Sequence, residues 1–324
     1  MQSLSNYKGR VYAGVDVGSV SVNVAALDEE LNVVHKQYIR TAGAPIAAVK
    51  KGLAELSGKG LTISGIGTTG SGRHLAGLLI GADEIKNEIT AHSVASMHYY
   101  PEASTVLEIG GQDSKIIIIH DRVVVDFAMN TICAAGTGSF LDQQAQRLGI
   151  DIRDFGALAA ASSRPTKIAG RCGVFAESDM IHKQQIGYSK EDIIAGLCDA
   201  LVQNYLNNVG HGKKIEKRIV FQGGVAANSG IVKSFMRALN AEITVPEHYD
   251  VMGAIGAAII TARSFRKNKS RITAFKGFEC AEGAIESTVF ECAACSNQCE
   301  IVSVKKDSRK LFNIGGRCGR YDAV

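Results

Sequence analysis

The chain has few prolines, no long apolar run and no excess of charge of one sign, and each of these absences excludes a class of protein. Its 324 residues include only 4 prolines, and 46% of them are apolar. A disordered chain would have fewer apolar residues and a more one-sided charge. The 36 basic and 32 acidic side chains leave a net charge of +4, which is too balanced to indicate nucleic acid or a membrane surface as a partner. The sequence therefore predicts an ordered globular protein.

The hydropathy pattern also bears on the location of the protein. No stretch approaches the ~20 apolar residues of a membrane span, and residues 1–10 contain no apolar signal core. We therefore expect a cytoplasmic protein without a membrane or nucleic acid among its partners. In that reducing compartment, the eight cysteines are better explained as metal ligands or buried thiols than as disulfides.

Two parts of the chain share one design. Residues 11–25 and 105–119 both have the pattern of an apolar strand, a glycine turn and a second strand, and residues 122–127 have the pattern of a third strand. Further patterns predict helices at 44–56, 88–99, 139–148, 174–185, 190–208 and 250–263, and short strands at 61–66, 218–221 and 242–245. The alternation favours α/β layers, and the repeated unit predicts two related lobes.

We expect four parts along the chain. Residues 1–100 form a first lobe, on which a helix near 250–263 packs back, and residues 101–263 form a second lobe that carries cluster-binding segments. The basic residues 264–279 form a linker. Residues 280–324, which hold five of the eight cysteines, form a small metal-binding module.

Glycine turns next to carboxylates indicate a nucleotide site. The turns at 16–19 and 110–113 place unobstructed backbone amides at a strand end, where they can hold phosphates, while Asp16 or Asp113 can hold hydrated Mg²⁺. The glycines at 223–224 let the backbone approach an adenine ring. Each motif alone is equally typical of an ordinary tight turn, but the three in this order indicate a nucleotide cradle. The residues expected at the bound cofactors are Asp16, Gly18, Ser19, Ser21, Gly110, Gly111, Gln112, Asp113, Gly223, Gly224 and Asn228, together with Gly136 and Gly138 of the Cys133 motif.

These elements resemble the actin, hexokinase and Hsp70-type ATPase superfamily, and residues 250–258 resemble its connecting helix. The resemblance covers residues 11–263. It implies ATP or ADP with Mg²⁺, Asp16 and Asp113 on the hydrated metal, and Gln112 orienting the attacking water. A further glycine cluster at 65–73 lacks the lysine of a Walker-type loop and is better explained as a flexible strand-to-helix turn, with Arg73 available for an interface or a phosphate.

Cys133 and Cys172 each stand just before a glycine-containing helix start. A helix N-terminus carries partial positive charge, which favours the thiolate form of a cysteine. Iron–sulfur cubes usually take four thiolates, so two well-placed cysteines per chain indicate a cluster shared across a two-fold homodimer interface. The alternative is burial as small apolar residues, which we expect for Cys198.

At these cysteines the chain resembles the BadF/BadG/BcrA/BcrD family, the activator ATPases of 2-hydroxyacyl-CoA dehydratases and benzoyl-CoA reductases. The matching stretches are 69–73, 109–115, 130–141 and 170–180. The resemblance implies a homodimer with one 4Fe-4S cluster held by Cys133 and Cys172 of both subunits. It also implies a reductive activase that takes electrons from ferredoxin or flavodoxin and, driven by ATP, passes them to a partner iron–sulfur protein. That partner is a dehydratase, a benzoyl-CoA reductase-like enzyme or a double-cubane cluster protein.

The C-terminal cysteines predict a second metal site of unknown identity. Four of them, Cys292, Cys295, Cys299 and Cys318, have the number and close spacing of a tetrathiolate site. Zinc would make it a structural staple and iron–sulfur an electron relay; the spacing fits either, and the function upstream slightly favours iron–sulfur. Cys280 is left over as a spare ligand or a buried thiol. Short dehydratase activators lack this extension, which looks more like larger or atypical members of the family, including reductases of double-cubane cluster proteins.

Two rival functions stay open. A sugar or acetate kinase of the same fold would use a carboxylate base and would need no paired cysteines at helix starts. A non-catalytic ATP-dependent scaffold or chaperone would have no redox-active cluster. Colour separates the activase from the kinase, because an anaerobically purified kinase would be colourless.

Overall fold

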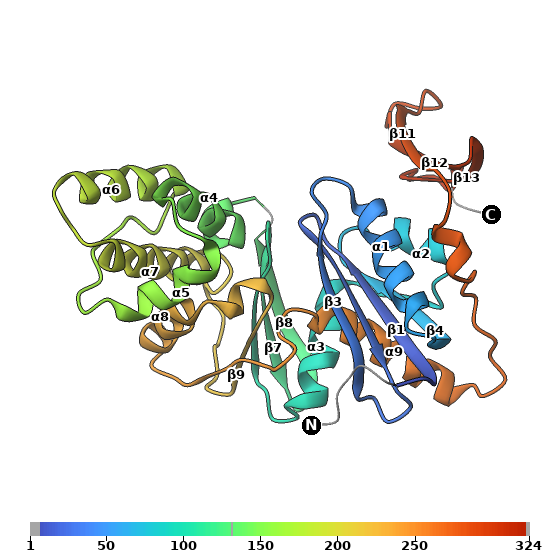
Figure 1. Cartoon of the computed structure of the whole chain (residues 1–324), viewed down its shortest axis with the longest axis horizontal. Helices are drawn as coiled ribbons and strands as arrows, with labels where there is room; N and C mark the ends of the chain where they lie inside the picture. The colour runs from blue at the N-terminus through green and yellow to red at the C-terminus, as the bar shows by residue number, and fades with distance from the viewer. Residues whose placement is uncertain (1–6, 131, 322–324) are drawn as a thin grey trace. The chain divides into compact units, whose positions relative to one another are not determined.

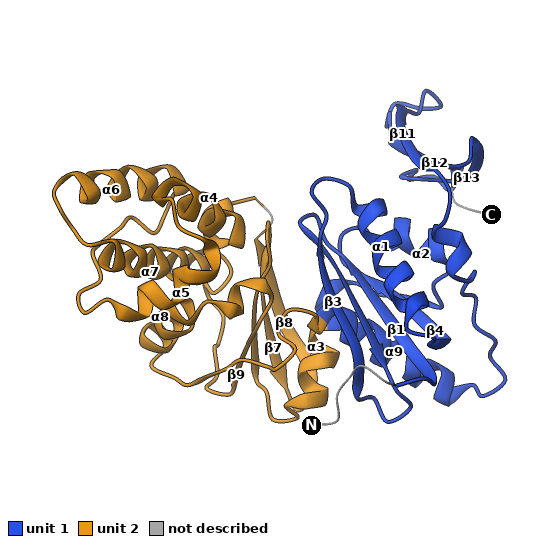
Figure 2. Cartoon of the chain, viewed as in Figure 1, with its two compact units in different colours: residues 1–91, 253–324 blue, residues 92–252 orange. Residues whose placement is uncertain are grey.

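The computed structural model describes residues 7–130 and 132–321 (Figure 1). The chain divides into two compact units (Figure 2). Unit 1 comprises Met1–Ala91 and Gly253–Val324, and unit 2 comprises His92–Met252. Each unit is built on its own five-stranded sheet.

The sheet of unit 1 has the order β3-β2-β1-β4-β5. Its strands are β1 (Arg10–Val17), β2 (Ser21–Leu27), β3 (Val33–Arg40), β4 (Thr62–Thr69) and β5 (Glu84–Ile85). The helices of this unit are α1 (Pro45–Gly58), α2 (Arg73–Ile80) and α9 (Met252–Lys267). Helix α9 packs closely on β1, because a Cβ added at Gly14 would lie only 1.9 Å from the Ala254 carbonyl oxygen. Glycine at this position is therefore required by the approach of the helix.

The sheet of unit 2 has the order β10-β9-β6-β7-β8. Its strands are β6 (Thr105–Ile109), β7 (Ser114–His120), β8 (Val123–Asn130), β9 (Ile219–Gln222) and β10 (Ile243–Thr244). The helices that follow along the chain are α3 (Glu88–Tyr99), which begins in unit 1, α4 (Gly138–Leu148), α5 (Ile152–Ala161), α6 (Gly173–Gln185), α7 (Lys190–Asn208) and α8 (Ser229–Leu239). The core of this unit joins the sheet to these helices through large buried side chains such as Phe155, Tyr205 and Phe235.

The two sheets have the same topology. In unit 1, β1 pairs antiparallel with β2 and parallel with β4. In unit 2, β6 pairs antiparallel with β7 and parallel with β9 in the same way. The outer strands repeat the pattern, since β2–β3 and β7–β8 are antiparallel while β4–β5 and β9–β10 are parallel. The two related lobes predicted from the repeated strand–turn–strand pattern are confirmed.

Local signals fix several helix starts. The Asp151 side chain accepts a hydrogen bond from the backbone of Arg153 at the start of α5, and Ser189 does the same for α7, which satisfies amides that a helix leaves unpaired. The helices predicted around 44–56, 88–99, 139–148, 174–185, 190–208 and 250–263 are present as α1, α3, α4, α6, α7 and α9. Strand β3 and helices α5 and α8 were not predicted, and α2 was indicated only by the strand-to-helix turn expected at residues 65–73. None of the described helices combines the length and apolar character of a membrane span.

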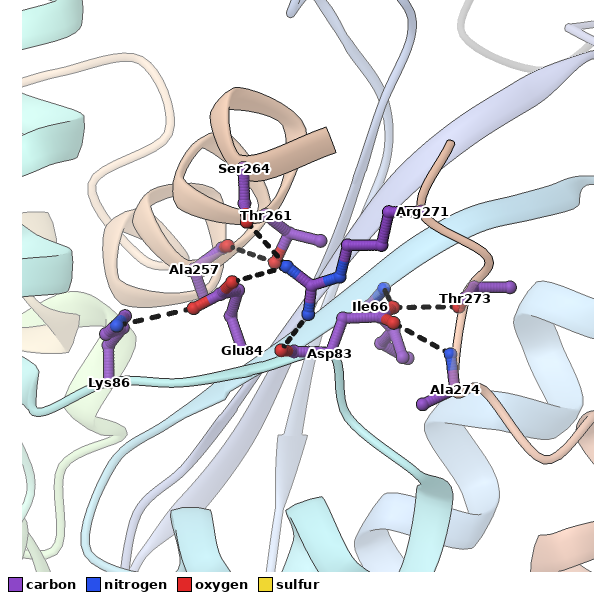
Figure 3. A network of polar contacts seen from close by, with 10 residues as sticks. All are labelled: Ile66, Asp83, Glu84, Lys86, Ala257, Thr261, Ser264, Arg271, Thr273 and Ala274. Atoms are coloured by element: carbon purple, nitrogen blue, oxygen red, sulfur yellow. Dashed lines mark hydrogen bonds and ion pairs between the residues drawn. The ribbon is translucent and has the colours of Figure 1, made fainter. Parts of the chain in front are cut away.

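The segment after α9 is bound to unit 1 along its length. Arg271 donates to the Glu84 carboxylate at 2.8 Å and to the Asp83 carbonyl at 2.6 Å. The Asp83 carboxylate accepts from Thr273 and Ala274, and Figure 3 draws these contacts. Burial disfavours a charge on Glu84, but hydrogen bonds, that from Arg271 first, outweigh it and hold the pKa of this carboxyl below its usual value. The basic segment at residues 268–277 is thus held against unit 1, and we call it the strap.

A three-stranded antiparallel sheet follows the strap. It consists of β11 (Ile285–Glu291), β12 (Glu300–Lys306) and β13 (Arg309–Ile314) in the order β11-β12-β13. The side chains of Ala281, Val304 and Phe312 are buried in the same hydrophobic cluster as β1 and α1 of unit 1. The small sheet therefore shares the core of this unit.

Candidate functional site

The turn between β1 and β2 carries the first predicted phosphate loop. The Gly18 amide donates to the Ser21 carbonyl at 2.9 Å, which closes a four-residue turn with Ser19 exposed at its tip. Asp16, at the end of β1, is only 9% exposed. The structure thus places the predicted carboxylate directly beside the turn.

Asp16 stands in a polar row across three strands. Its Cα partners in the sheet are Asn23 on β2 and Thr69 on β4, and paired residues project from the same face of a sheet. Asn23 is 9% exposed and Thr69 is fully buried, yet neither the Asn23 Oδ1 nor the Thr69 Oγ1 has a hydrogen-bond partner among the described residues. Buried oxygens without partners are costly. Both oxygens can accept from the water shell of a hydrated cation, and the Thr69 hydroxyl can also donate to a phosphate.

The glycine cluster at the end of β4 supports this row. The Gly72 amide and the Ser71 hydroxyl both donate to the Val17 carbonyl, at 2.8 and 3.3 Å. At Gly70, where φ is +89°, an added Cβ would lie 2.6 Å from the Asp16 carboxylate. Arg73 donates to the Gly70 carbonyl at 3.0 Å, so its guanidinium braces its own loop. The cluster is confirmed as a strand-to-helix turn that leads from β4 into α2.

The turn between β6 and β7 repeats this design in unit 2. The Gly110 amide donates to the Asp113 carbonyl at 3.0 Å, and Gln112 is exposed at the tip. Behind the turn, the Lys115 ammonium lies 2.9 Å from both the Asp113 and the Glu108 carboxylates. Lys115 and Glu108 are buried, whereas Asp113 is half-buried. The lysine therefore fixes one oxygen of the predicted magnesium-binding carboxylate.

The third predicted loop follows β9. Gly223 has φ of +92°, and a Cβ there would lie 2.4 Å from the Ile109 carbonyl oxygen, so only glycine fits this approach of the two strands' ends. Gly224 begins a short 3-10 turn, and Asn228 caps α8 by accepting hydrogen bonds from the amides of residues 230 and 231. The Asn228 Nδ2 is buried and has no partner among the described residues. The unpaired Asn228 N–H donor, in the loop where Gly223 allows close backbone packing, fits the binding of an adenosine group.

A buried set of hydrogen bonds among Gln222, Ser96 and His92 lies next to the Gly223 loop. The Gln222 side chain accepts from the Ser96 hydroxyl at 3.0 Å and contacts the His92 Nδ1 through its Nε2 at 2.8 Å. Burial, and secondarily the charge of Lys115, lowers the pKa of His92 to about 3. The imidazole is therefore neutral at pH 7, and its Nδ1 accepts the hydrogen bond from Gln222.

The Cys133 loop is held by one asparagine and joined to a predicted phosphate turn. The Asn130 side chain donates to the Cys133 carbonyl at 2.8 Å and accepts from the Cys133 amide at 2.9 Å. A few residues later, the Gly138 amide donates to the Gly110 carbonyl at 2.9 Å, and the Ser139 amide and hydroxyl donate to the Gly111 carbonyl at 2.8 and 2.6 Å. The predicted phosphate turn and the cysteine loop are thus parts of one hydrogen-bonded assembly.

Cys172 is the residue just before the first turn of α6, without a capping hydrogen bond from its side chain, and lies beside the Cys133 segment. A Cβ added at Gly173 would lie 3.8 Å from the Ala135 side chain, so the two segments are in contact. Both cysteines are partly exposed. Three apolar side chains next to them, Ile132, Val174 and Phe175, are 97%, 70% and 65% exposed. The pair therefore lies on an apolar surface of unit 2, and two thiolates on such a surface fit half of a shared cluster.

Other cysteines have different surroundings. Cys198 is fully buried in α7, and burial raises the pKa of its thiol well above the usual value, as expected of a structural thiol. At the C-terminus, Cys292 is buried while Cys295 and Cys318 are exposed. Across residues 7–130 and 132–321, no group of three or more His, Cys, Asp or Glu side chains is placed to hold a metal ion. The tetrathiolate site stays a prediction.

Four residues that the sequence reading did not single out join these sites. Asn23 and Thr69 stand in register with Asp16, and Lys115 holds Asp113. Asn204 of α7 lies 3.8 Å from the Cys133 sulfur. For Thr69 and Lys115 the signal was their place inside the glycine motifs, whereas Asn23 and Asn204 carry no local signal.

Comparison with known proteins agrees with the geometry. A model of the BadF/BadG/BcrA/BcrD ATPase family matches residues 13–261. The 2-hydroxyisocaproyl-CoA dehydratase activator of Clostridioides difficile is 32% identical over 267 residues, which are 80% of this chain and 97% of the relative.

Two solved structures support the same relationship. An activator of the 2-hydroxyisocaproyl-CoA dehydratase from Clostridium difficile with bound ADPNP superposes with a TM-score of 0.74 at 31% identity, covering 80% of this chain and 97% of the other. Component A of the (R)-2-hydroxyglutaryl-CoA dehydratase from Acidaminococcus fermentans gives 0.71 at 30% identity, covering 78% and 98%. The predicted actin/hexokinase-like α/β ATPase fold is confirmed. The strap and the small C-terminal sheet follow the part matched by the family model.

Proposed function

Because this chain belongs to the BadF/BadG/BcrA/BcrD ATPase family, we propose that it is an ATP-dependent reductive activase. It passes low-potential electrons through a 4Fe-4S cluster, held by Cys133 and Cys172 of two subunits, to a partner iron–sulfur enzyme. The observation that carries the proposal is the set of hydrogen bonds from Gly138 and Ser139 to the Gly110–Gly111 turn, because they join a phosphate-type loop to a cysteine loop.

The two hairpin turns and the loop after β9 supply the groups for ATP and Mg²⁺. Asp16 and Asp113 hold the hydrated metal, and Gln112, exposed at the tip of its turn, orients the attacking water. The unpartnered Thr69 Oγ1 and Asn228 Nδ2 support this assignment, since a ligand would satisfy both. Bound Mg²⁺ would neutralise phosphate charge and orient the phosphate for attack by water.

The link to α4 explains how the nucleotide state reaches the cysteines. A shift of the Gly110–Gly111 turn moves the start of α4, because the Ser139 amide and hydroxyl both bond to it. The Cys133 loop, five residues before Gly138, follows that movement. The size of this effect is limited by the difference in ATP and ADP affinity between the two conformations.

The cysteine surface supports a homodimer. Two thiolates per chain are half of the usual ligand set of a cube, and a two-fold axis would supply the other half. The exposed Ile132, Val174 and Phe175 would be covered by the same contact, which removes apolar surface from water.

The names of the relatives support the choice of partner, and the spacing of the C-terminal cysteines supports a second metal. Two relatives are named as activators of the 2-hydroxyisocaproyl-CoA and (R)-2-hydroxyglutaryl-CoA dehydratases, which supports an iron–sulfur dehydratase as the acceptor. A benzoyl-CoA reductase-like enzyme or a double-cubane cluster protein is the alternative acceptor. Within this proposal, ferredoxin or flavodoxin is the electron donor and the protein acts in the cytoplasm. The four C-terminal cysteines bind a second metal, iron–sulfur or zinc, as their spacing supports.

Metal analysis after anaerobic purification tests the proposal. The wild-type dimer is expected to carry about four iron atoms at the shared site, which Cys133→Ala and Cys172→Ala lose while keeping the C-terminal metal. Cys198→Ala, which changes a buried thiol in α7, is the matched control and keeps all metal. A colourless wild-type dimer that binds ATP and carries no iron at Cys133 and Cys172 refutes the activase, and phosphorylation of a sugar or acetate by it would support the kinase.

A further inference from the structure

Asn204 reaches both cysteine segments from the buried side. This residue of α7 is 1% exposed. Its Nδ2 donates to the Arg171 carbonyl at 3.2 Å and lies 3.8 Å from the Cys133 sulfur, and its Oδ1 accepts from Asn208 at 2.9 Å. Because a backbone carbonyl only accepts, the nitrogen of the amide must face Arg171. The Cys133 sulfur also lies 3.8 Å from the Asn204 Oδ1. A thiol could donate to that oxygen, but a metal-bound thiolate has no proton and can only accept, so in that state the second N–H of Asn204 faces the sulfur.

The loop is shaped to admit this side chain. A Cβ added at Gly136 would lie 2.8 Å from the Asn204 Oδ1 and 3.4 Å from the Asn130 Nδ2. Glycine at this position lets the Cys133 loop lie directly on two asparagine side chains. Asn130 holds the backbone of Cys133 on both sides, which leaves the sulfur as the group that Asn204 contacts.

We infer that Asn204 is a positioning residue of the cysteine site, which ties the Cys133 and Cys172 segments together and donates an N–H to the Cys133 sulfur. The inference rests on the proposed iron–sulfur function. Hydrogen bonds to the sulfurs are one of the factors that set the potential of a cluster. A donor stabilises the extra negative charge that the sulfur carries after a one-electron reduction, so it raises the reduction potential. Outer residues of this kind also fix the orientation of the ligands.

Replacing Asn204 by leucine tests both roles. Leucine has a similar volume but no N–H, so the Cys133 sulfur loses its donor and the Arg171 carbonyl loses its partner. The reduction potential, followed by EPR during a redox titration, is expected to shift to a more negative value. Release of iron to a chelator is expected to become about tenfold faster, the lower end of the effect of outer-residue mutations.

A second readout needs no cluster. After removal of iron, the rate at which iodoacetamide alkylates Cys133 is measured by mass spectrometry, with Cys172 followed in the same sample. Asn204→Leu is expected to speed alkylation of Cys133, because its loop is no longer tethered to α7. The control is Ser234→Ala, which removes a different, partly buried hydrogen bond to α7, that from the Ser234 hydroxyl to Asp199, and is expected to behave as the wild type in every measurement.

The outcomes separate the two proposals. A wild-type dimer without iron refutes the iron–sulfur function, and the alkylation rates then decide whether Asn204 tethers the loop. If iron is present but Asn204→Leu matches the wild type in potential, iron release and alkylation, the role of Asn204 is wrong. Circular dichroism checks the fold of the variant, and if leucine prevents folding, Asn204→Ala is measured by the same criteria.

Discussion

Replacing Thr69 by valine is expected to stabilise the fold while weakening ATP binding. Thr69 is fully buried at the end of β4, and its hydroxyl has no partner among the described residues. A buried hydroxyl without a hydrogen bond costs about 1–3 kcal/mol. Valine keeps the β-branched shape that suits a strand and removes that cost. We therefore expect the free energy of unfolding of the nucleotide-free protein to rise by about 1 kcal/mol.

The neighbouring Thr68 is the matched control. It is equally buried, but its hydroxyl donates to the Arg73 carbonyl at 2.9 Å. Thr68→Val removes this bond, which is expected to lower the free energy of unfolding by about 1 kcal/mol. Two adjacent, chemically identical substitutions should therefore change stability in opposite directions.

Urea unfolding without nucleotide and calorimetric titration with Mg-ATP measure the two effects. Thr69→Val should raise the urea midpoint and weaken Mg-ATP binding, because the hydroxyl beside Asp16 is available to the ligand. Should Thr69→Val instead destabilise the fold as much as Thr68→Val, the hydroxyl has a partner and the reasoning is wrong. An unchanged affinity for Mg-ATP would remove Thr69 from the nucleotide site.

Three more predictions test residues in and behind the proposed nucleotide loops. Gly223→Ala should lower the thermal stability more than Gly212→Ala and should also weaken ATP binding. Both positions have positive φ, where a non-glycine residue costs on the order of 1–3 kcal/mol, but only at Gly223 would the new Cβ meet backbone atoms. Thermal unfolding compares the two variants. Burial lowers the pKa of His92 from 6.5 to about 3, so the imidazole binds a proton more tightly in the unfolded chain than in the folded protein. The free energy of unfolding should therefore fall as the pH drops below 6.5, by about 2 kcal/mol at pH 5. In urea unfolding, His92→Gln should reduce this pH dependence. Lys115→Met leaves the buried Glu108 carboxylate without its lysine and should cost about 3–5 kcal/mol, of which the added Glu108→Gln should restore a part; failure to restore any would contradict the ion-pair explanation.

The sequence could predict the loops of the site because glycine turns are local signals. Gly18, Gly110 and Gly223 follow apolar strands, and the structure places each at a strand end as expected. Asn23 and Thr69 could not be predicted as partners of Asp16, because their nearness depends on how β2 and β4 align with β1. Strand register is set by packing of whole strands, which no short motif records.

Distance along the chain explains the other omissions. Asn204 lies 71 residues from Cys133, inside a helix that its apolar pattern predicts. That pattern does not show which side of the helix faces the Cys133 loop. The helices α5 and α8 were not predicted although each has a polar cap, Asp151 and Asn228. The sequence predicts Asn228 at the nucleotide, and the structure leaves room for both roles. The side-chain oxygen caps α8, while the side-chain nitrogen has no partner among the described residues.

The basic segment after α9 shows why charge alone is a weak guide to a linker. A run of basic residues is typical of a solvated tether, but Arg271 is held by the Glu84 carboxylate and the Asp83 carbonyl, groups that precede it by 187 and 188 residues. Farther along, the Lys276 amide and ammonium donate to carbonyls of α2, at residues 80 and 78. Helix α2 starts at the turn that packs against Asp16 and ends at this strap. One short helix therefore starts beside the strand end that carries Asp16 and ends at the segment leading to the C-terminal cysteines, so this segment is fixed to the same unit that carries Asp16.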